Sequence, residues 1–63
     1  MNKNSAIATI SKQRQQWLDE YHLQKSYAKD YINAADRIEA LEAADNALAE
    51  VKALDLILDH IED

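Results

Sequence analysis

The chain has 63 residues, 48% of them hydrophobic, and a net charge of −5, with no glycine, proline or cysteine. This composition excludes disulfides and thiolate metal sites, and a domain so small is marginally stable on its own. Scaffolds of this size commonly gain stability from a partner chain. We therefore expect a single helical domain, residues 1–63, that self-associates.

The opening stretch "MNKNSAIATISKQ" contains no long apolar run. No later window approaches the roughly 18 apolar residues of a membrane span, so neither a signal peptide nor a membrane contact is expected. The lack of cysteine fits a cytoplasmic location. Residues 1–4 are predicted to be disordered, and Asn4 or Ser5 is a suitable cap for a first helix.

A first helix is predicted over about residues 5–32, because strong helix formers dominate this half and helix breakers are missing. Its apolar positions alternate in steps of three and four residues. That heptad spacing is typical of a coiled coil, in which one face of the helix packs on a neighbour. The first seam consists of Ile7, Ile10, Arg14, Trp17, Tyr21, Gln24, Ala28 and Tyr31.

A second helix is predicted over about residues 36–61, with a seam of Ala40, Ala44, Ala47, Val51, Leu54, Leu58 and Ile61. The two seams are out of register by two residues, which is about 200° of rotation on one helix. A single straight helix would place its apolar stripes on opposite sides, so we predict a break at Asn33–Asp36. Asn33 or Asp36 would cap the second helix. A break near residues 43–46 is the alternative boundary.

An antiparallel hairpin centred on residue 34 brings the two seams together. It pairs Trp17 with Val51, and it places Arg14 opposite Leu54 with the guanidinium reaching water. A kinked or splayed pair of helices also satisfies the phase argument. The contact between Trp17 and Val51 within one chain distinguishes the hairpin from these alternatives.

Further apolar residues flank the seams and widen each stripe beyond what one neighbouring helix covers. We expect them to form an oligomer or partner interface, in a dimeric four-helix bundle or a trimer of hairpins. These residues are Leu18, Tyr27, Ile32, Leu41, Leu48 and Ile57.

The sequence contains no pattern with catalytic, cofactor-binding or metal-binding content, so we do not expect an enzyme. His22 and His60 are interpreted as surface residues. The acidic positions Glu39, Glu42, Asp45, Asp55 and Asp59 are interpreted as a solvated outer face.

Charge is distributed unevenly along the chain. Residues 1–32 carry five Lys/Arg and three Asp/Glu, whereas residues 33–63 carry two Lys/Arg and nine Asp/Glu. Two oppositely charged helices lying side by side account for this. The acidic balance makes nucleic acid an unlikely partner. The alternative function is a nucleic-acid regulator, acting through weak binding by the first helix or through acidic mimicry by the second.

The opening "MNKNSAIATISKQRQQWLDEYH", the length of 63 and the acidic, all-helical character resemble the small accessory proteins of lambdoid bacteriophages. These are the short reading frames between the exonuclease and excisionase genes of phage lambda. The resemblance implies an early phage protein in the host cytoplasm. Such a protein modulates development, including the choice between lysis and lysogeny, by contacting host or phage proteins. It offers no catalytic residues. The architecture is also similar to the ROP type of hairpin dimer, in fold only.

Overall fold

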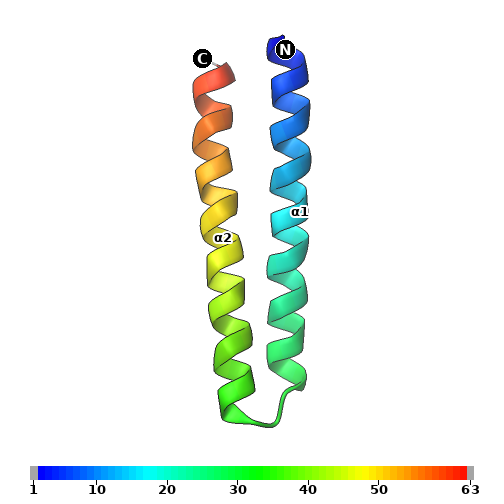
Figure 1. The fold of residues 1–63 in the computed structure, drawn as a ribbon, viewed down its shortest axis with the longest axis vertical. Helices are drawn as coiled ribbons and strands as arrows, with labels where there is room; N and C mark the ends of the chain where they lie inside the picture. The colour runs from blue at the N-terminus through cyan, green and yellow to red at the C-terminus, as the bar shows by residue number, and fades with distance from the viewer. Residues whose placement is uncertain (1, 63) are drawn as a thin grey trace.

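The fold is an antiparallel pair of long helices, seen in a computed structural model that describes residues 2–62 apart from the side chain of Glu62 (Figure 1). Helix α1 spans Lys3–Asp30 and helix α2 spans Ala34–Glu62. The hairpin measures 47 × 14 × 13 Å. Both chain ends lie at one end, which we call the open end, and the connection lies at the other, the turn end. The predicted all-α antiparallel hairpin is confirmed.

Helix α1 begins at Lys3, two residues before its predicted start, because Asn2 caps it. The side-chain oxygen of Asn2 accepts a hydrogen bond from the Ser5 backbone N–H at 2.8 Å. This bond satisfies one of the N–H groups that a helix leaves unpaired at its start. Lys3 and Asn4, which were predicted to be disordered, therefore lie in the first turn, and neither Asn4 nor Ser5 is the cap. Met1 lies outside the described residues.

The connection between the helices is short and contains no glycine. Tyr31 ends α1 in an extended conformation, with φ −77° and ψ 128°, and no described residue has a positive φ. The chain therefore reverses without the left-handed conformation that favours glycine. The alternative break near residues 43–46 is wrong, because α2 runs through them without interruption.

Helix α2 starts at Ala34 because Asn33 caps it. The Asn33 side-chain oxygen accepts from the Ala35 backbone N–H at 2.8 Å. Asp36, the other predicted cap, lies instead in the first turn, where its negative charge suits the helix dipole. The predicted break at Asn33–Asp36 is thus placed too late, since α1 ends at Asp30 rather than residue 32 and α2 starts two residues before residue 36.

The core between the helices is narrow and made of small side chains. Its five buried residues are Ala28, Ala40, Ala44, Ala47 and Val51, and all five belong to the predicted seams. Ala44 is fully buried, at 0% exposure. Four alanines allow the helices to approach closely, but they bury little apolar surface. The larger seam residues Ile7, Ile10, Tyr21, Leu54, Leu58 and Ile61 are half-buried, at the margins of this strip.

Two seam residues lie where the sequence did not place them. Trp17 is 41% exposed, so it sits at the edge of the seam, whereas Val51 is buried. Arg14 was expected to face Leu54 and reach water. Its Nε donates instead to the Asp55 carboxylate at 2.5 Å. Asp55 is therefore an ion-pair partner across the hairpin and not part of a solvated outer face.

No helix within the described residues is both long enough and apolar enough to span a membrane. Neither do those residues bring together three side chains of the types that ligate metals.

Candidate interaction surfaces

The hairpin has two broad sides, separated by the buried seam. Residues seven positions apart lie in one row on a packed helix, so each side is defined by a few such rows. One side carries Leu18 of α1 and Leu41 and Leu48 of α2, and we call it the leucine face. The other side carries Trp17, Tyr27 and Tyr31, and we call it the aromatic face.

The leucine face is identified by an open hollow near the turn end. Lys25 of α1 and Leu41 of α2 both line this hollow, which has a volume of about 410 Å³. Leu18 lies seven residues before Lys25, and Leu48 lies seven residues after Leu41. These three leucines therefore share one side of the hairpin. Leu41 is 38% exposed, while Leu18 and Leu48 are half-buried.

The same hollow is basic. Lys25, Lys29 and Arg37 line it, together with Ala28 and Leu41. The Arg37 guanidinium also donates to the Tyr31 carbonyl at 3.0 Å, which holds this side chain against the turn. Three of the seven cationic residues of an acidic protein thus meet at the turn end of the leucine face.

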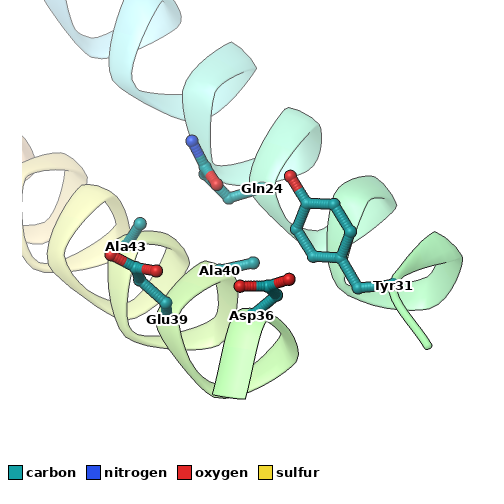
Figure 2. A pocket seen from close by; sticks show the side chains of 6 residues that line it. All are labelled: Gln24, Tyr31, Asp36, Glu39, Ala40 and Ala43. Carbon is teal, nitrogen blue, oxygen red and sulfur yellow. The ribbon is translucent and has the colours of Figure 1, made fainter. Parts of the chain in front are cut away.

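The aromatic face is identified by a second hollow on the opposite side of the seam. Figure 2 shows Gln24 projecting from α1, Tyr31 directly after the end of α1, and the Asp36 and Glu39 carboxylates projecting from α2. Ala40 and Ala43 also line the hollow, whose volume is about 450 Å³. The hollow therefore places an aromatic ring beside two carboxylates.

Other aromatic and apolar side chains continue along this side. The Tyr27 ring stacks on Tyr31 with centroids 6.1 Å apart. Trp17 lies fourteen residues before Tyr31 in the same row, and it lines a smaller hollow with Gln16 and Glu20. Gln24 donates to the Glu20 carboxylate at 2.8 Å. Ile57, fourteen residues after Ala43, extends the face along α2 and is 45% exposed.

The six predicted interface residues do not form one continuous surface. Tyr27 and Ile57 lie on the aromatic face. Leu18, Leu41 and Leu48 lie on the leucine face, and Ile32 is 96% exposed in the turn. One flat surface cannot cover both faces at once.

Three further apolar residues, Leu23, Ile38 and Leu56, are exposed and were not among the predicted interface residues. Leu23 lies one row outside the aromatic face, and Ile38 lies one row outside the leucine face. Leu56 points away from the partner helix. Their apolar character was the available signal. It was overlooked because only positions next to the seams were considered.

Comparison of the chain with models of protein families, with curated proteins and with solved structures found no match.

Proposed function

We propose that this protein is a non-enzymatic interaction protein that associates with itself and contacts another protein. The observation that carries the proposal is the mismatch between core and surface. The core is four alanines and one valine, while nine large apolar side chains are 38% to 96% exposed. An apolar surplus of this kind marks an interface, and so small a hairpin needs the added burial.

We place the second copy on the leucine face. Leu48 is at the midpoint of α2, fourteen residues from each end, and Leu18 is close to the midpoint of α1. A twofold axis passing near them, perpendicular to the helices, makes each leucine row pack on its own counterpart. Such self-complementary contacts are the rule in homodimers.

Charge favours the arrangement in which the two turns lie at opposite ends. On the leucine face the cations gather at the turn end, as Lys25, Lys29 and Arg37. Toward the open end this face carries Asp55, seven residues after Leu48, which already pairs with Arg14, and the neighbouring row adds both Lys52 and Asp59. Turning the second copy end to end keeps the three cations of each turn end apart, whereas turns at the same end would bring six cations together.

A single label distinguishes the two arrangements. The chain has no cysteine, and Ile32 is almost fully exposed in the turn, so Ile32→Cys gives one spin label per copy without disturbing the core. We expect a separation close to the 47 Å length of the hairpin. A separation of about 10 Å, the spacing of packed helices, would refute the opposite-end arrangement.

The choice of face is tested by Leu41→Ala, with Leu56→Ala as its control. Both changes remove the same atoms from an exposed position on α2, but only Leu41 lies on the leucine face. We expect light scattering to show weaker association for Leu41→Ala and unchanged association for Leu56→Ala. Equal behaviour of the two variants would remove the leucine face from the proposal.

The resemblance to the accessory proteins of lambdoid phages supports a more specific proposal, in which the protein regulates phage development by binding a host or phage protein. Affinity purification of the tagged chain from a bacterial host, followed by identification of co-purifying proteins, tests this role. Recovery of no specific protein would count against it.

A second candidate function, contact with nucleic acid, is favoured by the basic hollow at Lys25, Lys29 and Arg37. Phosphate binding by these side chains competes with the dimer contact proposed above, because both use the same cations. If nucleic acid is the ligand, Lys25→Gln with Lys29→Gln abolishes a salt-dependent gel shift. If no shift is seen at low salt with the unchanged protein, this candidate fails.

A further inference from the structure

We propose that the aromatic face docks an arginine-rich segment of a partner protein. The inference rests on the proposed function, since a second copy seated on the leucine face leaves the aromatic face free. It goes further by naming the chemistry of the partner. Three features of the face carry it: its charge, its two hollows and the distance between them.

The charge of the aromatic face is negative apart from histidine and from Lys3 at the open end. Among the described residues, Lys3, in the row of Trp17 and Tyr31, is the one Lys or Arg in the rows that form this face. They contain carboxylates on both helices, including Glu20 on α1 and Asp36, Glu39 and Glu50 on α2. The other cations of the protein lie on the leucine face and on the outer surfaces of the helices. An approaching cationic segment therefore meets attraction over the part of the face that holds the two hollows.

The two hollows each combine an aromatic ring with a carboxylate. Tyr31 lies with Asp36 and Glu39 in the larger hollow (Figure 2), and Trp17 lies with Glu20 in the smaller one. A guanidinium group stacks on an aromatic ring and at the same time pairs with a carboxylate through its planar fork of N–H donors. Both parts of this recognition are present at each hollow.

The other candidate occupants fit poorly. A second copy placed on this face would bring two sets of unpaired carboxylates together, which is unfavourable. Nucleic acid would be repelled, because its phosphates meet the carboxylates of the two hollows, which no Lys or Arg lines. A purely apolar partner would bury the carboxylates without pairing them.

The spacing of the hollows specifies the partner further. Trp17 and Tyr31 are fourteen residues apart, which corresponds to about 21 Å along a helix at 1.5 Å per residue. A helical partner segment lying along the face therefore reaches both hollows with arginines fourteen residues apart. This suits a basic helix docking side by side with α1 and α2.

The experiment uses Trp17 as its own reporter, since it is the single tryptophan of the chain and lines one of the hollows. The full-length protein is titrated with an alanine-rich helical peptide carrying an arginine at every seventh position, while Trp17 emission is recorded. We expect a saturable change in emission that is weaker when lysine replaces arginine in the peptide. Absence of any change would overturn the proposal.

Two matched variants separate the face from net charge. Glu39→Gln and Glu42→Gln each remove one negative charge from α2 at positions three residues apart, but only Glu39 lines the larger hollow. We expect Glu39→Gln to weaken peptide binding roughly two- to fivefold, the range for one partly exposed ion pair, and Glu42→Gln to leave it nearly unchanged. Equal weakening by both would mean that the peptide senses only overall charge, and the proposal would fail.

The aromatic contribution is tested at constant charge with Tyr31→Leu. This change should weaken binding of the arginine peptide more than binding of the lysine peptide, because the ring stacks on guanidinium. An equal loss of affinity for both peptides would contradict stacking. Light scattering on the same samples reports self-association separately. Peptide binding to a monomer would overturn the proposed dimer alone, whereas a dimer that does not bind the peptide would overturn this inference alone.

Discussion

Val51 is the largest of the five buried side chains, so shortening it measures how much the seam between α1 and α2 holds the hairpin together. Val51→Ala removes two carbons, which is about 1.6 kcal/mol of apolar burial at 0.8 kcal/mol per methylene. The cavity left behind adds to this loss. The higher helix propensity of alanine offsets up to about 0.7 kcal/mol. We expect a net loss of about 1.5 kcal/mol in the free energy of unfolding.

Urea unfolding followed by circular dichroism checks this value, and a thermal melt should fall by roughly 6–12 °C for a domain of this size. Leu56→Ala is the control, because it removes more carbons from the same helix at a position that is 63% exposed. It should change stability by less than about 0.5 kcal/mol. Both variants are compared at one protein concentration, since the proposed self-association would contribute to stability. If Leu56→Ala lowers the free energy of unfolding as much as Val51→Ala does, the seam between the helices is not what stabilises the hairpin.

Three further predictions concern the caps, the packing and the ion pair. Asn33→Ala should lower the free energy of unfolding in urea by about 1 kcal/mol, because it removes the cap of α2. Asn46→Ala, within the helix, should cause no such loss. Similar losses for the two variants would contradict the capping role of Asn33. Ala44→Leu should lower stability by about 1–3 kcal/mol through overpacking, and an unchanged melting temperature would show that the helices are not in close contact there. A double-mutant cycle of Arg14→Gln and Asp55→Asn should give a coupling of up to about 1 kcal/mol that decreases with salt, and zero coupling would refute the pair.

The break between the helices was predictable because it shifts the phase of the apolar pattern. The two-residue phase slip required a reversal near the centre even though the sequence contains no glycine. The position of the turn was less accessible, since Asn33 and Asp36 are both good caps. The choice of Asn33 follows from the extended backbone at Tyr31, which completes the reversal in three residues.

The surfaces were less predictable than the seam. A flanking residue such as Leu41 or Tyr27 looks equivalent in each helix taken alone, and only the antiparallel pairing shows that the two occupy opposite sides. The Arg14–Asp55 pair was missed for a related reason. The long arginine side chain leans from the seam onto the leucine face, where it reaches the residue next to its predicted neighbour Leu54.

The central claim is that this hairpin exposes too much apolar surface to remain alone. Sedimentation equilibrium of the unchanged chain at micromolar concentration, with circular dichroism on the same sample, tests it most directly. We predict a helical species with twice the 7.2 kDa mass of one chain. A fully helical, cooperatively folding species of 7.2 kDa would contradict the claim.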